Sequence, residues 1–489
     1  MNINEKQGEI QQNLMEFRQK IYEGFACMGD ALMNLVDALS SNERVNSPPE
    51  LSENEQFERG HDSLYKGIAG LAKKVEEDKL ELEGKVAGYI EPYLPKPEVR
   101  SFYLLGVDGT PLPCPYARTA EDRSYIYRPN PAPGVKPVTI GHAASSVVLL
   151  PEKEEGEPAW VVPLRMERIP TDLGEKQVGL NQLGGLLTDE KLPFHNELTV
   201  TVVDSKYGQI PFLYPMWDYK NHVVIARMRA DRVLYRQAEE RDESEPSPKG
   251  RPPEYGERFA FKEEETWGEP DYKDTHEWSS VRGKKRRTQL RQWGDLLMLG
   301  DDGMRMSDKP FSVIRVDVFK EDGTPLYKRP MWLMVFGQRR AEISLLDAHL
   351  AYKQRFDHEH YFRFGKRNLL LDKYQSPDIA KLDVWLFLNQ LAYLQLWLAR
   401  HLAGPSPKPW QRHLPQPTLG QPATPTHTQR DFGRIIRHFG TPASESKRRG
   451  KSPGRTKGTQ MTKRKRRKFK KSAKKPKKKS KKKSKKSSK

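Results

Sequence analysis

The order of apolar segments between residues 98 and 230 constrains the fold of this chain most. Three strand-like runs come first, then one segment with helical spacing, and then two more strand-like runs. In order, they read "SFYLLGVDGT", "VKPVTIGHAASSVVLL", "AWVVPLRMERI", "EKQVGLNQLGGLLTDEKL", "ELTVTVVDS" and "HVVIARMRA". Strands interrupted by a helix predict an α/β layer fold with a mixed sheet, because each element must bury its apolar face against another.

The segments on either side of this region have different patterns. Residues 8–41 and about 60–92 carry apolar side chains at helical spacing, which predicts a helical N-terminal region over 1–97. Over 231–340 a polar, Pro-rich stretch is followed by "FSVIRVDVFKEDGTPLYKRPMWLMVFG", which predicts a hairpin turning at "EDGT". We therefore expect 98–230 to be the first part of the α/β core, 231–340 an inserted β-rich module, and 341–404 the helical second part of the core.

Trp267, Trp278 and Trp293 are three of the tryptophans in the expected insertion. Buried indole rings commonly fill a small core, and this is the interpretation we favour for all three. The alternative is a surface platform on which a nucleic-acid base stacks.

The positive charge of the chain is concentrated at its C-terminus. The formal net charge is +20, yet residues 447–489 contain 25 Lys and Arg and no acidic residue, so the other 446 residues carry a net charge of −5. A Pro-rich linker and a short helix are expected over 405–446. The Lys-rich tail cannot bury enough apolar surface to offset its chain entropy, so we expect 447–489 to be disordered. A polyanion such as nucleic acid is its expected partner, although a solvated extension without function is the alternative.

Several protein classes are disfavoured by the sequence. Cys27 and Cys114 are the two cysteines and form no CxxC pair, which argues against a disulfide framework or a cysteine zinc site. The N-terminus lacks the basic start and apolar core of a signal peptide, and no apolar run reaches the roughly 18 residues of a membrane span. We expect a soluble, cytoplasmic protein without a membrane partner.

Two aspartates follow apolar strand-like runs. Asp108 follows "FYLLGV", and Asp204 follows "LTVTVV". Such residues are commonly turn or cap residues. If the two strands are neighbours in one sheet, however, their carboxylates can share divalent cations, and Mg²⁺ prefers oxygen-rich coordination of this kind.

A third acidic residue lies in the polar segment "AYKQRFDHEHYFRFGKRN", residues 351–368, between two apolar runs. If the segment is one helix, Tyr352, Arg355, Glu359 and Lys366 lie within about 60° of one another and form one polar stripe. An exposed amphipathic helix with intrahelical ion pairs is the alternative interpretation.

The spacing of this stripe matches the YREK signature of bacterial insertion-sequence transposases of the DDE type, and the chain resembles that family elsewhere. Asp108 ends an early strand in "LLGVDGT", and "VDSKYG" places Tyr207 three positions after Asp204. The segments "RDFGRIIRHFGTP" and "RGKSPGRTKG" also look like the ends of such transposases. The resemblance covers roughly residues 100–460 and implies an RNase H-like fold interrupted by a β-rich insertion.

The resemblance also implies roles for individual residues. Asp108, Asp204 and Glu359 would be the catalytic, metal-binding triad, separated by 96 and 155 residues. They would hold two Mg²⁺ ions, with Mn²⁺ as an alternative, which activate water or a 3′-hydroxyl for attack on a phosphodiester. The longer second spacing is what a module inserted before the glutamate helix would produce.

The other members of the signature would bind double-stranded DNA at the element ends and the target. Arg355 and Lys366 would contact phosphates near the cut, and Tyr352 would pack on or hydrogen-bond the DNA end. The helices of 1–97 would bind the element ends, and the protein would act as a homodimer on paired ends, associated with a bacterial nucleoid. No helix-turn-helix or heptad pattern supports these last points, which follow from the resemblance alone.

Two other functions remain open from the sequence. One is an RNase H-like metal-dependent nuclease that hydrolyses nucleic acid without strand transfer. The other is a non-catalytic DNA-binding derivative in which the Lys-rich tail matters most. An assay for joined product distinguishes the first from a cut-and-paste transposase, and loss of metal-dependent cleavage on changing Glu359 distinguishes the second.

The charge of the tail generates a first testable prediction. Deleting residues 447–489 should weaken non-specific DNA affinity and flatten its dependence on salt, because fewer phosphate contacts release fewer counterions. Binding to a short duplex, titrated at several salt concentrations, measures both effects. An unchanged salt slope would show that the tail does not neutralise phosphates.

Overall fold

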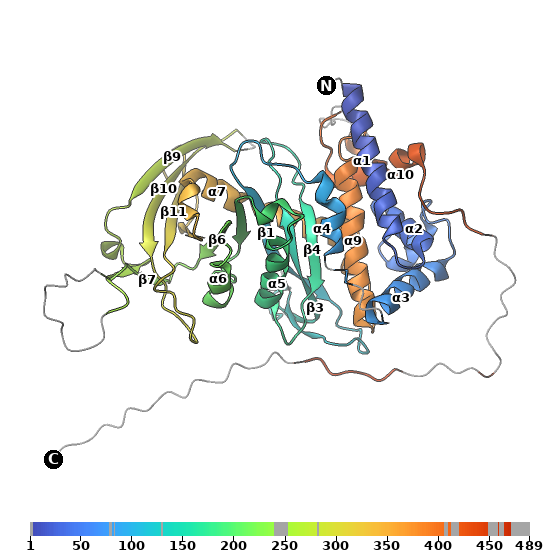
Figure 1. Ribbon diagram of the computed structural model, residues 1–489, viewed down its shortest axis with the longest axis horizontal. Helices are drawn as coiled ribbons and strands as arrows, with labels where there is room; N and C mark the ends of the chain where they lie inside the picture. Colours follow the sequence, from blue (N-terminus) through green and yellow to red (C-terminus); the bar gives the residue numbers. More distant parts are fainter. Residues whose placement is uncertain are drawn as a thin grey trace, which may run out of the picture.

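The protein is described from a computed structural model. The structure describes residues 3–77, 81–82, 84–128, 131–238, 253–280, 283–404, 409–411, 420–447, 458 and 464–470. The molecule is elongated, with strands β9–β11 at one end, the helices α1–α3 and α10 at the other, and the central sheet between them (Figure 1).

A mixed sheet of ten strands forms the centre of the molecule. Its strand order is β2-β3-β1-β5-β6-β12-β11-β10-β9, and β4 pairs with β3 beside this path. β1 is antiparallel to β3 and parallel to β5, and β5 is parallel to β6. The bounds of the strands in this part are β1 Tyr103–Pro113, β2 Ser124–Tyr127, β3 Val138–Leu149, β4 Val162–Arg168, β5 Thr199–Val203 and β6 His222–Met228. The mixed α/β architecture expected from the sequence is confirmed.

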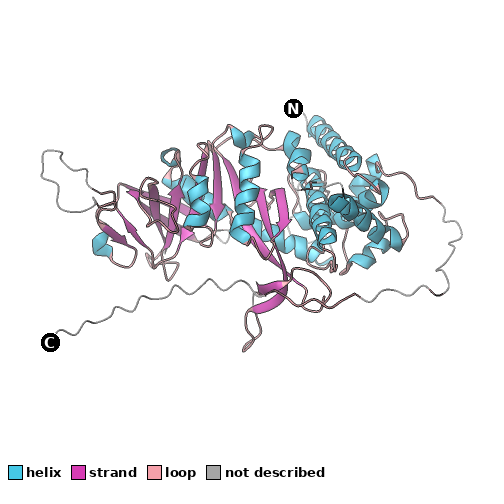
Figure 2. Ribbon diagram, turned by 60° about the horizontal axis from the view of Figure 1, so that its bottom comes forward, coloured by secondary structure: helices cyan, strands magenta, loops and turns pink. Residues whose placement is uncertain are grey.

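Helices cover both faces of the first strand. Val107 lies against the helix α5 (Glu175–Leu187), whereas the neighbouring Gly106 lies against His358 of α8 (Phe356–Asn368). Successive residues of a strand point to opposite faces, so α5 and α8 lie on opposite sides of β1. The short helix α6 (Ile210–Met216) packs on β6. Figure 2 shows how the helices flank the sheet.

The helical region at the N-terminus is organised around α9 (Ile379–Ala399). This helix is apolar on all sides and buried over almost its whole length, so it must be enclosed by other elements. It packs against β4 and against the surrounding helices, which are α1 Ile3–Glu23, α2 Gly29–Ser40, α3 His61–Glu77, α4 Lys85–Ile90 and α10 Pro425–Phe439. A buried guanidinium, Arg18, donates to Asp37 Oδ2 at 3.0 Å and to Gln395 Oε1 at 3.0 Å, and so connects α1, α2 and α9.

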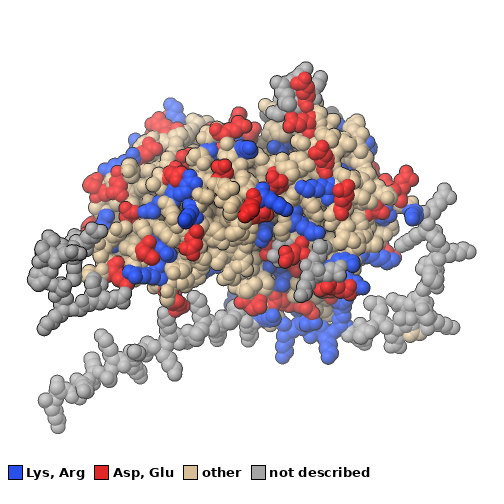
Figure 3. All heavy atoms as spheres, in the orientation of Figure 1, with Lys and Arg blue, Asp and Glu red and all other residues tan. Residues whose placement is uncertain are grey.

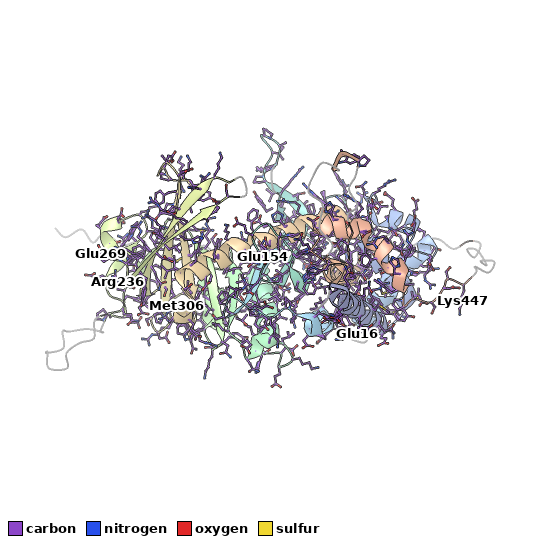
Figure 4. All side chains as sticks on the ribbon, turned by 90° about the horizontal axis from the view of Figure 1, so that it is seen from above. Glu16, Glu154, Arg236, Glu269, Met306 and Lys447 are labelled. Atoms are coloured by element: carbon purple, nitrogen blue, oxygen red, sulfur yellow. The ribbon has the colours of Figure 1, made fainter. Side chains whose placement is uncertain are left out.

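The strands between residues 231 and 340 continue the central sheet. β12 (Met331–Phe336) pairs antiparallel with β6, and the sheet then runs through β11 (Phe311–Lys320), β10 (Lys285–Leu296) and β9 (Tyr272–Ser279). The expected hairpin is present as β11 and β12. The separate pair β7 (Val233–Tyr235) and β8 (Arg258–Ala260) lies beside it. In Figure 4, Arg236, Glu269 and Met306 mark this end of the molecule, and Glu16 and Lys447 mark the helical end.

Aromatic side chains form the core of this β-rich part. Trp267 and Trp293 are buried, as expected, and pack with Phe259, Phe261 and Trp332. Trp278 is different. It is half-buried on the outermost strand β9, and the ammonium group of Lys353 lies 4.3 Å from the centre of its ring.

The structure divides two of the expected helical segments. Residues 8–41 are two helices, because the backbone turns at Met28, which has a left-handed φ of 53°. Residues 351–368 are also divided between two helices, α7 (Leu345–Gln354) and α8, which meet at Arg355. At this junction the N–H of Arg355 donates to the carbonyl of Tyr352 at 3.2 Å, a tighter bond than the α-helical one. The expectation of one uninterrupted helix over 351–368 is therefore wrong.

Most of the C-terminal tail lies outside the described residues. The prediction that 447–489 is disordered therefore concerns mostly residues that the structure does not describe. Within it, residues 464–470 lie beside β2 and bond to the core. Among the residues that the structure describes, none of the helices combines the length and the apolar composition that crossing a bilayer requires.

Buried His222 generates a stability prediction. It lies in β6, its Nε2 is 2.8 Å from Thr201 Oγ1, and burial lowers its pKa from 6.5 to about 3. Because the folded pKa lies below the unfolded one, the protein is destabilised as pH falls from 6.5 towards 3, by about 1.4 kcal/mol per pH unit for this group. The free energy of unfolding, measured by urea titration at several pH values below 6.5, should therefore fall with this slope in the wild type relative to His222→Gln. Parallel pH profiles for the two proteins would contradict the assignment.

Candidate active site

Parallel pairing of β1 and β5 brings two aspartates together. Val107 of β1 is in register with Val203 of β5, so Asp108 and Asp204 follow at neighbouring positions. β5 ends here, whereas β1 continues to Pro113 paired with β3 alone, so Asp108 does not end its strand as expected from the sequence. The charges of Asp108 and Asp204 repel, and each acts on the pKa of groups around the site.

Arg355 connects the first aspartate to the glutamate of α8. Its Nη1 donates to Asp108 Oδ2 at 2.8 Å, and its Nη2 donates to Glu359 Oε1 at 3.2 Å. The junction between α7 and α8 places the guanidinium between the two carboxylates. The Arg355 side chain is 14% exposed and that of Glu359 38%, so the carboxylate at the α8 end of the bridge faces solvent. Residues 247 positions apart are thus joined in one ionic cluster.

The Asp108 carboxyl is costly to ionise in this position. Its pKa is raised from 3.8 to about 6. Burial is the largest cause, Arg355 and the Gly109 N–H act to lower the pKa, and the charges of Asp204 and Glu175 act to raise it. The Gly109 N–H donates to Asp108 Oδ1 at 2.8 Å. A buried carboxylate beside other carboxylates requires a cation, and Arg355 provides one here.

Glu175 is a fourth carboxylate at this site, and the sequence analysis did not identify it. It is the first residue of α5, and its carboxyl group lies against Gly109, where a Cβ would be 2.6 Å from Glu175 Cδ. The hydroxyl of Tyr207 donates to Glu175 Oε1 at 3.2 Å, and the ammonium group of Lys206 pairs with Oε2. An acidic residue in the first turn of a helix is common, so the sequence carried no signal that set Glu175 apart.

The turn after β5 holds both Asp204 and the residues that contact Glu175. The N–H of Lys206 donates to Asp204 Oδ1 at 2.8 Å, which fixes the orientation of this carboxylate. Tyr207 is fully buried, and its ring packs edge-on against Phe212 with the centroids 5.0 Å apart. The Asp, two residues, Tyr pattern therefore orients one carboxylate through the backbone and contacts another through the phenol.

The remaining signature residues lie in different surroundings. Tyr352 is buried near the cluster, with the Arg355 guanidinium 5.7 Å from its ring centre. Lys366 lies further along α8; burial lowers its pKa, and its electrostatic partner is Asp372. The described contacts thus join Arg355 to Asp108 and Glu359. They join Lys366 to none of the proposed triad residues.

The donor chemistry of the site fits divalent cations. Carboxylate oxygens from Asp108, Asp204 and Glu359 are ligands that Mg²⁺ prefers, and the guanidinium that bridges two of them shows that the cluster attracts positive charge. Within the described ranges, no three His, Cys, Asp or Glu side chains already lie close enough to enclose an ion.

The strand order around this site defines the class of protein. Strands β4, β3, β1, β5 and β6 form three antiparallel neighbours followed by two parallel ones, with carboxylates at the β1–β5 junction and on a later helix. This is the strand order of an RNase H-like fold.

The chain belongs to the DDE superfamily of endonucleases. The family model described as "DDE superfamily endonuclease" matches residues 21–292, more than half of the chain. The match includes Asp108, Glu175 and Asp204, and ends before Glu359. Proteins of this superfamily act on DNA and generally use divalent metal ions. No curated protein matches this chain at a significant level.

Arg355 generates a prediction about stability and metal. Replacing it by Met should destabilise the metal-free protein by about 3 kcal/mol, because Asp108 and Glu359 lose their shared cation. Mg²⁺ or Mn²⁺ should restore part of this loss by neutralising the same carboxylates. Urea unfolding with EDTA and with each metal measures both effects.

A matched control is Arg363→Met, which removes an exposed guanidinium from the same helix. It should change stability by less than about 0.5 kcal/mol, with or without metal. If the two variants behave alike, Arg355 does not neutralise the cluster.

Proposed function

We propose that this protein is a DNA transposase that cuts the ends of an insertion sequence and joins them to a target, by two-metal-ion chemistry and a cut-and-paste route. The observation that carries the proposal is the cluster in which Asp108 and Asp204 lie at adjacent strand positions and Arg355 joins Asp108 to Glu359. Family membership supports an endonuclease acting on DNA. The YREK subtype and a bacterial source are part of the proposal.

In this proposal Asp108, Asp204 and Glu359 are the catalytic residues and hold two Mg²⁺ ions, or Mn²⁺ in their place. When bound, the ions supply an activated water or 3′-hydroxyl and stabilise the leaving oxygen. Asp108 lies in β1, Asp204 directly follows β5, and Glu359 lies on a helix that packs against β1, so the fold sets the backbone positions of the three residues. Burial of Asp108 strengthens its interaction with a cation, since charges attract more strongly in a less polar medium.

Tyr352, Arg355 and Lys366 are proposed to bind DNA close to the cut. Arg355 has the planar donor geometry that suits a phosphate, and a metal ion that neutralises its carboxylate partners would leave its guanidinium available. Lys366 is half-buried with a lowered pKa, and a nearby phosphate would favour its charged form. Tyr352 lies next to Arg355 and would pack against the same DNA end.

The domain boundaries are proposed as expected from the sequence. Residues 98–230 and 341–404 form the RNase H-like core, and 231–340 form the β-rich insertion. Residues 1–97 would bind the element ends, 405–446 are the linker and short helix, and 447–489 are the basic tail. Trp278 is the tryptophan of the insertion set apart from its aromatic core, and its contact with Lys353 places it beside α7. It is therefore the tryptophan of the three that we propose could receive a DNA base.

Paired cutting and joining of two ends is most simply performed by two copies of the chain. We therefore propose a homodimer bound to paired element ends, acting on DNA in the bacterial nucleoid. Short inverted repeats bordered by direct duplications, found by sequencing the DNA around the coding region, would support the proposed substrate.

The catalytic role of Glu359 is tested with a charge-neutral, nearly isosteric change. Glu359→Gln should reduce Mg²⁺-dependent cleavage of the element ends by at least about 1,000-fold, because a metal-binding carboxylate is lost, while DNA binding stays within about twofold. Single-turnover cleavage and binding of one labelled end-containing duplex measure the two effects.

Glu190→Gln, at an exposed carboxylate away from the cluster, is the matched control and should cut normally. Cleavage that survives Glu359→Gln would refute the assignment. Cleavage by the wild type that never yields joined product would instead favour the nuclease without strand transfer, and binding without any cleavage would favour a non-catalytic derivative.

A further inference from the structure

The described part of the C-terminal tail, residues 464–470 ("RKRRKFK"), contacts the edge strand β2 and the loop that precedes it. β2 pairs with β3 on one side, which leaves its other edge available. Lys470 forms a parallel bridge with Ser124, and its N–H donates to the carbonyl of Arg123 at 2.7 Å. The N–H of Arg467 donates to the carbonyl of Arg118 at 2.9 Å. The backbone of the tail therefore bonds to the start of this edge through one β-bridge and to the loop before it, and backbone bonding at a sheet edge is a common way to bind a peptide.

Three ion pairs fix the side chains of this segment. Each joins a basic residue of the tail to an acidic residue of the core: Arg464 with Asp378 at 2.7 Å, Lys470 with Asp122 at 2.8 Å, and Arg467 with Glu121. Figure 3 shows basic side chains gathered at the lower edge of the molecule next to acidic ones. The segment contains six basic residues, and three carboxylates of the core pair with three of them.

Asp122 is held in place by the core as well as by the tail. Its carboxylate also accepts from Arg168 Nη1 at 2.6 Å and from the N–H of Thr171 at 3.2 Å, and its side chain is 8% exposed. The anchoring carboxylate is therefore oriented before the tail arrives, which lowers the entropy cost of binding.

A single aromatic residue interrupts the basic run and makes an apolar contact. Phe469 packs edge-on against Tyr125 of β2, with the ring centroids 4.9 Å apart. Its side chain is half-buried, whereas Lys465, Arg466 and Lys468 are exposed. The segment thus combines strand pairing, an aromatic anchor and ion pairs at defined positions, which distinguishes it from a basic chain attracted by charge alone.

We propose that Glu121, Asp122, Tyr125 and Asp378 form a binding site for the basic segment of this chain's own C-terminal extension, and that bound DNA and this site compete for the segment. Each exposed ion pair contributes little by itself. The covalent connection, however, gives the segment an effective concentration on the order of millimolar, which favours binding within one chain. DNA phosphates compete through counterion release, so this site limits the non-specific DNA affinity of the tail.

The proposal is tested with a variant that leaves the charge of the tail unchanged. Phe469→Ala removes the aromatic anchor and should release the segment. In the full-length protein, trypsin should then cleave after Arg464, Lys465, Arg466 and Arg467 about tenfold faster than in the wild type, because cleavage requires local opening. Mass spectrometry of timed digests gives the rate at each bond. Cleavage at 477–489 provides an internal reference and should be unchanged.

DNA binding gives a second, independent measurement. With up to three more cations free, the affinity of Phe469→Ala for a short non-specific duplex should fall up to about 40-fold more than that of the wild type between 50 and 200 mM salt. Tyr125→Ala removes the other ring of this aromatic pair, on the surface of β2, and should reproduce both effects. Glu121→Gln should increase cleavage within the segment, whereas the charge-matched control Glu155→Gln should not.

Equal cleavage and equal salt slopes for the wild type, Phe469→Ala and Tyr125→Ala would overturn the proposal. Protection that disappears on dilution would also overturn it, because the segment would then come from a second copy of the chain. These measurements require neither metal nor catalysis, so they remain informative whether or not the protein proves to be a transposase.

Discussion

The parallel pairing of β1 with β5 is the interaction on which the candidate site depends. Asp108 and Asp204 are far apart in the sequence. They become neighbours because Val107 of β1 is in register with Val203 of β5. Parallel neighbours cannot be joined by a tight turn, so β3, β4 and α5 occupy the connection between them. The same connection carries Glu175 to the site, because α5 begins beside Gly109. One pairing therefore positions three of the carboxylates.

Concentrating carboxylates in a partly buried place has an electrostatic cost, and the chain offsets it locally. Arg355 lies at the junction of α7 and α8, where the backbone tightens, and bridges Asp108 and Glu359. Lys206 neutralises Glu175 through an ion pair, and the hydroxyl of Tyr207 orients the same carboxylate by donating a hydrogen bond. The raised pKa of Asp108 shows that this compensation is incomplete. In the proposed function, this remaining imbalance would favour a divalent cation at the site.

The two ends of the molecule are attached to the central sheet in different ways. The β-rich part continues the sheet through β12 and β6, so its aromatic core is fixed relative to the carboxylates, and Trp278 reaches Lys353 of α7. The N-terminal helices instead surround the apolar helix α9, which packs on β4. The edge at β2 receives residues 464–470. Each attachment covers a feature that would otherwise face solvent: the edge of a sheet, an apolar helix, or unpaired acidic side chains.

The sequence by itself determined the order of most elements and identified three of the acidic residues of the candidate site. Alternating and helical periodicity located β1, β3, β4, α5, β5 and β6, because each buries a face whose period the residues display. The acidic residues were recognisable because they interrupt or follow apolar runs. Their participation in catalysis stays a prediction.

Only the tertiary structure decided which residues meet. The break at Arg355 was not visible in the spacing, since a helix and two helices joined by one tight turn share nearly the same periodicity. Glu175 resembled an ordinary helix-start residue until the β1–β5 crossover placed it beside Gly109. The binding of residues 464–470 to β2 was equally hidden, because a basic run indicates charge and says nothing of which acidic edge lies within reach. Periodicity encodes local burial, whereas contacts between distant segments depend on how strands pair, and that is settled when the chain folds.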